Sequence, residues 1–194
     1  MAQISAIVLA AGKSERMGRP KALLSIHGRT FLENILATIR LAKIADVVVV
    51  VGRHRDEILE SIALPNVVFN PDYEQGMITS IQTGIRALSG ASDGALLFLV
   101  DHPAVTEHTI ETLVERFSPG RIVLPTYECR RGHPVLFSRG ILDEILEVPV
   151  TAGANVVVRK DPSRIIEVPV EDSGVTFDVD TPEDYSRLNF GARR

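Results

Sequence analysis

The 194-residue sequence lacks the features that mark several large classes of protein. Its single cysteine, Cys129, excludes an intramolecular disulfide and a cysteine-based zinc cluster, so a reducing, cytoplasmic setting is expected. No apolar run approaches the ~20 residues of a membrane-spanning helix, and the first three residues lack the basic start of a signal peptide. With 21 Lys and Arg against 25 Asp and Glu, the chain lacks the basic surplus typical of nucleic-acid binders. We therefore expect contact with neither membranes nor nucleic acids.

The composition is that of an ordinary folded domain. Hydrophobic residues make up 45% of the chain and charged residues 24%. The sequence has no internal repeat and no linker rich in proline, glycine or serine. Residues 1–194 are therefore expected to form one domain, which is long enough to bury a large core.

Apolar, β-branched runs alternate along the chain with segments of helical periodicity. The strongest predicted strands are Ile4–Ala10, 47–52 and 95–100, and Thr30 followed by Glu33 predicts a capping box that opens a helix. This alternation predicts an α/β three-layer sandwich with a mostly parallel sheet, and residues 121–138 predict an antiparallel excursion. Further predicted strands are 66–69, 121–124, 134–137 and 164–170; the predicted helices are 30–42, 56–63, 77–88, 106–117, 141–147 and 182–188.

The segment after the first strand is the strongest candidate for an anion site. Ligands of such sheets gather at the carboxyl ends of the strands, and residues 11–21, here called the first loop, follow directly after Ala10. Glycines let backbone N–H groups turn toward an anion, and nearby cations add charge, which is the pattern of a phosphate site. The alternative is a solvated, charged turn. The cations are Lys13, Arg16, Arg19 and Lys21, and the glycines are Gly12 and Gly18.

Aspartates follow other strands or lie near the carboxyl end of the chain. Asp101 comes directly after the apolar run 95–100, and Asp178 and Asp180 share one face of an extended segment. Carboxylates beside a phosphate site indicate a cation between them, most simply Mg²⁺. Asp101 has an alternative role as a turn residue. Asp180 or Thr181 can equally cap the helix that follows, so Asp178 is the better candidate ligand of the two.

Five stretches of the sequence, spread over nearly the whole chain, form a recognisable pattern. They are Leu9-Ala10-Ala11-Gly12 with Ser14, Arg16-Met17-Gly18 and Lys21; Gln75-Gly76-Met77 with Ser80-Ile81; Asp101 with Pro103; Gly132-His133-Pro134-Val135; and residues 178–184. Together they resemble the signature of the MobA-like NTP transferases, and the similarity is greatest to the cytidylyltransferases that act on the molybdenum cofactor.

The resemblance implies a Rossmann-like nucleotidyltransferase fold and a Mg²⁺-dependent reaction. A nucleoside monophosphate would pass from an NTP to a small phosphorylated acceptor, with release of pyrophosphate. Ala11 favours CTP, since cytidylyl members typically have Ala-Ala-Gly where guanylyl members have Ala-Gly-Gly. The implied acceptor is the molybdopterin-bound molybdenum cofactor, and the implied protein partner is a molybdoenzyme or its chaperone in transient contact.

On this interpretation the site residues fall into three groups. Ser80 has an alternative role as a helix cap, Lys13 as a solvent-facing cation and His133 as a turn residue before a proline. The catalytic residues would be Arg16, Lys21, Asp101 and Asp178, with Asp101 and Asp178 as metal ligands ahead of Asp180. The nucleotide-binding residues would be Leu9, Ala10, Ala11, Gly12, Lys13, Gly76, Met77 and Ser80, and the acceptor-binding residues Gly132, His133 and Pro134.

One departure from the family pattern leaves the acceptor open. An acid and an arginine are expected around the Gly-Ala of residues 153–154, and neither is present at those places. The alternatives are therefore nucleotidyl transfer to a sugar phosphate or an isoprenoid precursor, or a non-catalytic carrier of the molybdenum cofactor. Joint retention of Lys21, Asp101 and Asp178 favours catalysis, since simple binding needs no metal pair.

Overall fold

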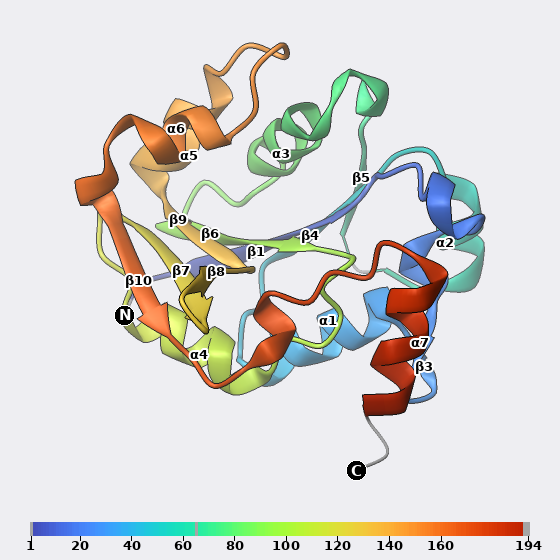
Figure 1. Ribbon diagram of the computed structural model, residues 1–194. Helices are drawn as coiled ribbons and strands as arrows, with labels where there is room; N and C mark the ends of the chain where they lie inside the picture. The colour runs from blue at the N-terminus through green and yellow to red at the C-terminus, as the bar shows by residue number, and fades with distance from the viewer. Residues whose placement is uncertain (1, 65, 192–194) are drawn as a thin grey trace.

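The computed structural model describes residues 2–64 and 66–191 and has three layers, with a central sheet between two sets of helices (Figure 1). The strand order is β10-β7-β9-β6-β1-β4-β5, with β8 paired to β7, and β2 and β3 form a separate hairpin. The strands are β1 (Ile4–Ala10), β2 (Ser25–Ile26), β3 (Arg29–Thr30), β4 (Val47–Val51), β5 (Val67–Phe69), β6 (Gly94–Leu99), β7 (Ile122–Tyr127), β8 (Arg130–Arg131), β9 (Val135–Ser138) and β10 (Ile165–Pro169).

The sheet is mostly parallel, as predicted. Strand β1 pairs in parallel with β4 and β6, while β9 runs antiparallel to both β6 and β7. The antiparallel excursion predicted for residues 121–138 is thus confirmed. The helices are α1 (Phe31–Leu41), α2 (Arg55–Ser61), α3 (Met77–Arg86), α4 (Glu107–Glu115), α5 (Arg139–Leu146), α6 (Asn155–Lys160) and α7 (Pro182–Gly191).

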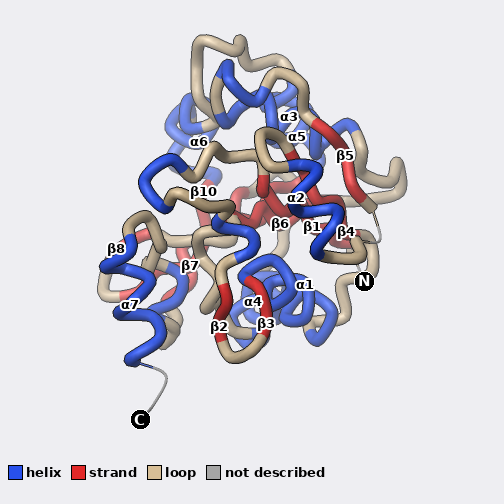
Figure 2. Tube along the Cα trace, turned by 90° about the vertical axis from the view of Figure 1, so that its right-hand side faces the viewer, coloured by secondary structure: helices blue, strands red, loops and turns tan. Residues whose placement is uncertain are grey.

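Both faces of the central strands are buried, which explains their continuous apolar runs. Successive side chains of a strand point to opposite faces, so Val8 of β1 joins the core beside α1 and α4, whereas Ile7 and Leu9 join the core beside α3 and α5. Figure 1 shows these two pairs of helices on opposite sides of the sheet. The parallel arrangement brings the carboxyl ends of β1, β4 and β6 to one edge, which faces the viewer in Figure 2.

Three short elements were not predicted from the sequence. The β2–β3 hairpin and β8 contain two residues per strand, too few to show a period of two. The segment Asn155–Lys160 has a run of three valines typical of a strand, but it forms α6, and Val157 is buried in the core. Tertiary packing therefore overrides the local preference of this segment.

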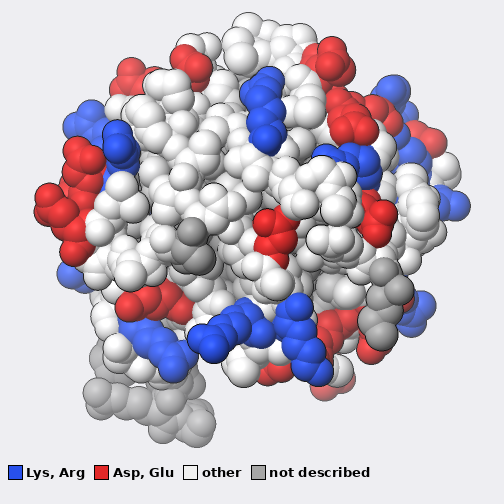
Figure 3. Space-filling view, turned by 180° about the vertical axis from the view of Figure 1, so that it is seen from behind, with Lys and Arg blue, Asp and Glu red and all other residues white. Residues whose placement is uncertain are grey.

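Charged side chains of both signs are exposed on the rear of the molecule. Lysine and arginine lie close to aspartate and glutamate around the rim of that face, and its middle is largely uncharged (Figure 3). None of the helices in residues 2–64 and 66–191 is long and apolar enough to cross a membrane.

The predicted capping box forms at the start of α1. Thr30 Oγ1 accepts a hydrogen bond from the Glu33 N–H at 3.2 Å, and the Thr30 N–H donates to Glu33 Oε2 at 2.8 Å. The Glu33 carboxylate accepts hydrogen bonds from the Thr30 N–H and from the Thr30 hydroxyl, and both lower the pKa of Glu33. We expect Thr30→Ala to lower the free energy of unfolding by ~1 kcal/mol, which corresponds to about 2–4 °C in Tm. Urea and thermal denaturation test this, and an unchanged Tm would contradict the capping role.

Candidate functional site

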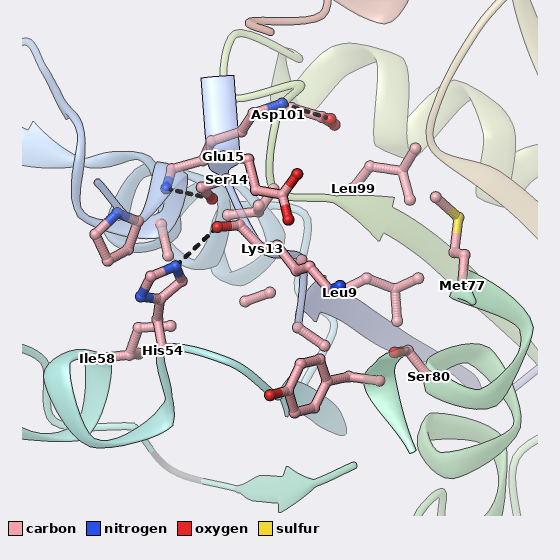
Figure 4. Close-up of a pocket in the computed structure, with 18 of the residues that line it drawn as sticks. Leu9, Lys13, Ser14, Glu15, His54, Ile58, Met77, Ser80, Leu99 and Asp101 are labelled. Atoms are coloured by element: carbon pink, nitrogen blue, oxygen red, sulfur yellow. Dashed lines mark hydrogen bonds and ion pairs between the residues drawn. The ribbon is translucent and has the colours of Figure 1, made fainter. Parts of the chain in front are cut away.

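A pocket opens at the carboxyl edge of the sheet, between the first loop, α2 and the start of α3 (Figure 4). Its volume is about 420 Å³, enough for a nucleotide-sized ligand. Most of its wall comes from segments that follow β1, β4 and β6, as expected for a sheet of this kind. The lining residues are Leu9, Ala10, Ala11, Gly12, Lys13, Ser14, Glu15, Arg16, Pro20, Lys21, Ala22, His54, Ile58, Tyr73, Met77, Ser80, Leu99, Val100, Asp101 and Asp180.

The first loop forms the wall nearest to β1 and contributes three of its four cations. Lys13, Arg16 and Lys21 line the pocket, whereas the Arg19 guanidinium lies 5.6 Å from the centre of the Tyr185 ring. Ser14 has φ 53°, in the left-handed region, and its Oγ accepts a hydrogen bond from the Lys21 N–H at 3.1 Å. This bond ties the two ends of the loop together.

Gly52, at the end of β4, lets the first loop and the segment before α3 approach each other closely. A Cβ atom at this position would lie 2.7 Å from the Ala11 carbonyl oxygen and 2.9 Å from Tyr73 Cβ. Because backbone atoms cannot give way cheaply, we expect Gly52→Ala to displace the pocket wall and weaken nucleotide binding about tenfold. Nucleotide titration measures this, with Gly90→Ala as a control at a position where a Cβ meets no atom within 4 Å.

Lys21 lies between two carboxylates at one end of the pocket. Its Nζ is 3.3 Å from Asp101 Oδ2 and 2.5 Å from Asp180 Oδ1, and its side chain is only 12% exposed. Arg16 Nη2 lies 2.6 Å from Asp180 Oδ2. The cluster therefore joins the first loop, the end of β6 and the segment before α7, three parts of the chain that are far apart in sequence.

The two carboxylates of this cluster are held in the ionised form. Burial raises the pKa of Asp101, but the hydrogen bond from His102 and the charge of Lys21 outweigh it, and the pKa falls to about 2. Hydrogen bonds from Lys21 and Arg16 likewise lower the pKa of Asp180, although burial opposes them. Both side chains are thus charged near neutral pH, as a metal ligand requires.

The structure favours Asp180 over Asp178 as the second carboxylate, the reverse of the order expected from the sequence. The Asp178 side chain is exposed and makes no hydrogen bond or ion pair with the described residues. Thr181 is the residue that caps α7, since its Oγ1 accepts from the Asp184 N–H at 3.2 Å. Asp180 is therefore free of the capping role and turns toward Lys21.

Asp101 and Asp180 suit a divalent cation that keeps water and phosphate oxygens among its ligands. Among the described residues no group of three or more His, Cys, Asp or Glu side chains is arranged to hold a metal ion. Mg²⁺ typically binds through one or two carboxylates together with substrate phosphates, so two converging carboxylates fit it without further protein ligands. Both carboxylates contact Lys21 Nζ, so their negative charges lie close to each other.

The start of α3 contributes Met77 and Ser80 to the pocket lining, whereas Gly76 lies outside it, and the nucleotide-binding role of these residues stays a prediction. Gly76, with φ 113°, occupies the N-cap position, so the alternative role of Ser80 as a helix cap is wrong. Ser80 is buried, and its Oγ accepts from Asn70 Nδ2 at 2.9 Å. The Ser80 hydroxyl proton can still be donated to a ligand.

The segment of Gly132, His133 and Pro134 lies outside the pocket lining and contacts His102 through the His133 ring. The His133 ring packs 5.2 Å from the His102 ring, and burial together with the neighbouring His102 lowers the pKa of His133 to about 4. Its Nδ1 is buried without a hydrogen-bond partner. The acceptor-binding role of this segment stays a prediction.

Several pocket residues were not singled out from the sequence. Among them Glu15 is charged, His54 and Tyr73 are polar, and Ile58 and Val100 add apolar surface. The signal for His54 was its position directly after the second strand, but nothing local indicated its partners. Tyr73 enters the pocket from a single 3₁₀ turn, which has no sequence period.

Comparison with known proteins assigns the chain to a family. The profile of the MobA-like NTP transferase domain matches residues 6–165. Among curated relatives, the nicotine blue oxidoreductase of Paenarthrobacter nicotinovorans is 32% identical over 196 residues, covering 95% of this chain and 96% of that protein. The molybdenum cofactor cytidylyltransferase of Escherichia coli (strain K12) is 29% identical over 188 residues, covering 95% of each protein.

Solved structures agree with this assignment. Rv0371c from Mycobacterium tuberculosis H37Rv superposes with a TM-score of 0.86 at 30% identity, covering 97% of this chain and 98% of that one. A second structure of Rv0371c, in complex with manganese, has a TM-score of 0.81 at 28% identity over 97% and 99% of the two chains. The matched range, the Rossmann-like sheet and the pocket at its carboxyl edge agree, and the chain belongs to the MobA-like NTP transferase family.

Proposed function

We propose that this chain is a cytoplasmic, Mg²⁺-dependent cytidylyltransferase that moves CMP from CTP to a small phosphorylated acceptor. The favoured acceptor is the molybdopterin-bound molybdenum cofactor. The observation that carries the proposal is the position of Lys21 between Asp101 and Asp180, at one end of the pocket built by the first loop. The relative from Escherichia coli, similar over 95% of this chain, supports the choice of CTP and acceptor. Delivery of the product would bring the chain into transient contact with a molybdoenzyme or its chaperone.

The reaction requires positioning and neutralisation of charge more than acid–base chemistry. An oxygen of the acceptor phosphate forms a bond to the α-phosphorus of CTP, and the bond from that phosphorus to the bridging oxygen breaks. Pyrophosphate leaves with the electron pair. The acceptor phosphate is already ionised near neutral pH, since its second pKa is ~6, so no general base is needed.

Each part of the pocket has a role in this reaction. Arg16 and Lys21 neutralise the leaving pyrophosphate, and the backbone from Ala11 to Lys13 holds the phosphates. Asp101 and Asp180 are the residues that would hold Mg²⁺, which supplies charge stabilisation and orientation when bound. Ser80 and Met77 contact the nucleoside.

A second candidate function is reduction with a nicotinamide dinucleotide. The observation that favours it is the similarity to nicotine blue oxidoreductase over 95% of this chain. Such a dinucleotide also carries phosphates that suit the first loop. This second function does not explain why the carboxylates of Asp101 and Asp180 both contact Lys21.

Thermal stabilisation by a panel of nucleotides tests these candidates. The panel contains CTP, GTP, ATP, UTP and NADH, each with Mg²⁺ and with a chelator. A ligand at about a hundredfold excess over its Kd stabilises the native state by ~2.7 kcal/mol. A Mg²⁺-dependent shift with CTP supports the proposal, and Mg²⁺-dependent pyrophosphate release with the molybdenum cofactor then separates an enzyme from a carrier. A shift with NADH alone would favour the second candidate.

A further inference from the structure

His54 forms a bridge between the first loop and α2. Its Nε2 lies 3.0 Å from the Lys13 carbonyl oxygen, and its Nδ1 lies 2.9 Å from Glu57 Oε1 (Figure 4 shows the first contact). A carbonyl and a carboxylate can only accept hydrogen bonds, so each ring nitrogen must donate one. The ring with two N–H groups is the imidazolium, and the bridge is complete only in that form.

The bridge restrains the peptide that joins Lys13 and Ser14 in the first loop. The Lys13 carbonyl belongs to the same planar, trans peptide as the Ser14 N–H, so fixing one sets the direction of the other. Ser14 has φ 53°, a conformation that costs free energy for a residue with a Cβ. It persists only where the surrounding contacts impose it. Two contacts restrain Ser14. The Lys21 N–H donates to its side-chain Oγ, and His54 contacts the carbonyl of the preceding peptide.

We propose that His54 is a positioning residue whose imidazolium form holds the first loop in the conformation that binds the nucleotide triphosphate. The inference rests on the proposed function, because it takes the first loop as the triphosphate site. His54 touches no reacting atom and acts through the backbone of Lys13 and Ser14.

Each half of the bridge depends on one ring N–H. Without one of the two protons, a nitrogen lone pair faces an acceptor oxygen, and that half of the bridge is lost. The Lys13 side chain is turned to Glu74, with 3.7 Å between Nζ and Oε1, and so does not replace the bridge.

His54→Leu, which removes both donors, is the main test variant. We expect the KM for CTP with Mg²⁺ to rise about tenfold, while kcat changes less than about twofold. His54→Gln keeps one amide donor for the Lys13 carbonyl and should restore part of the affinity. Its KM should therefore lie between that of the unmodified protein and that of His54→Leu. His108→Gln, at an exposed position of α4, is the matched control and should leave both parameters unchanged.

Amide hydrogen exchange without nucleotide tests the positioning role separately. We expect His54→Leu to speed exchange in residues 11–21 and to leave α4 unchanged. Unchanged exchange there, or an unchanged KM, would overturn the inference. If the unmodified protein binds no nucleotide, the proposed function and the triphosphate role of the loop both fail, and exchange still decides whether His54 holds the loop.

Discussion

Lys21→Gln is expected to lower kcat about a thousandfold while the protein stays folded. The Lys21 side chain is only 12% exposed, and its ammonium lies within 3.3 Å of both Asp101 and Asp180, so its charge acts close to the point where pyrophosphate would leave. Glutamine keeps a donor of similar length for the carboxylates but removes the charge. Steady-state release of pyrophosphate measures the loss, and circular dichroism and Tm verify the fold.

Glutamine is a sharper test here than charge reversal. A glutamate at this position would put a third carboxylate beside two that are largely buried, and repulsion alone could unfold the site. Lys160→Gln serves as the control, because Lys160 lies on the surface and makes an ion pair with Glu144 at 3.0 Å. Such pairs contribute ~0–1 kcal/mol. A folded Lys21→Gln protein with activity close to normal would remove Lys21 from the mechanism.

Asp180→Asn and Asp178→Asn should have very different effects, although the two residues are separated only by Val179. We expect Asp180→Asn to lower Mg²⁺-dependent activity about a hundredfold and to raise the Mg²⁺ concentration needed for half-maximal rate. Asp178→Asn should leave both within about twofold, because its side chain is exposed and makes no hydrogen bond or ion pair with the described residues. Asparagine preserves size in both variants, so the difference isolates the charge.

The same pair can be compared without knowledge of the acceptor. Stabilisation by CTP in the presence of Mg²⁺ should be reduced in Asp180→Asn and preserved in Asp178→Asn. Asp101→Asn should behave as Asp180→Asn does, since both carboxylates contact Lys21. The opposite pattern, with loss in the Asp178 variant alone, would restore the ligand order that the sequence suggested.

The sequence predicted the fold well where local patterns report the tertiary environment. Strand β1 is buried throughout and apolar except at Ser5, because helices cover both of its faces, and its bounds agree with those predicted for Ile4–Ala10. Thr30 caps its helix as expected, because an N-cap depends on atoms within four residues. The helix α6 was missed because the burial of Val157, rather than the preference of its valine run, decides its conformation.

The candidate site was predicted only in part. The first loop, Asp101, Met77 and Ser80 follow strands or open a helix, and the topology carries such positions to one edge of the sheet. Arg19 shares the charge of its neighbours but packs against Tyr185, which no local pattern indicates. The partners of His54 were equally hidden, since one belongs to a loop 41 residues away.

By itself, the sequence determined the order of strands and helices, the place of the cation-rich loop and the family to which the chain belongs. These three features depend on short-range periodicity and on motifs whose residues lie close together in the sequence. Only the tertiary structure shows that Asp180, and not Asp178, contacts Lys21. Alternation along an extended segment puts both on one face, but the Val179 N–H donates to the Asp101 carbonyl at 2.9 Å, and Thr181 then turns the chain into α7. The direction of each aspartate side chain therefore depends on contacts across the molecule, such as the ion pair of Asp180 with Lys21, 159 residues away. The spacing of residues along the sequence does not contain these contacts.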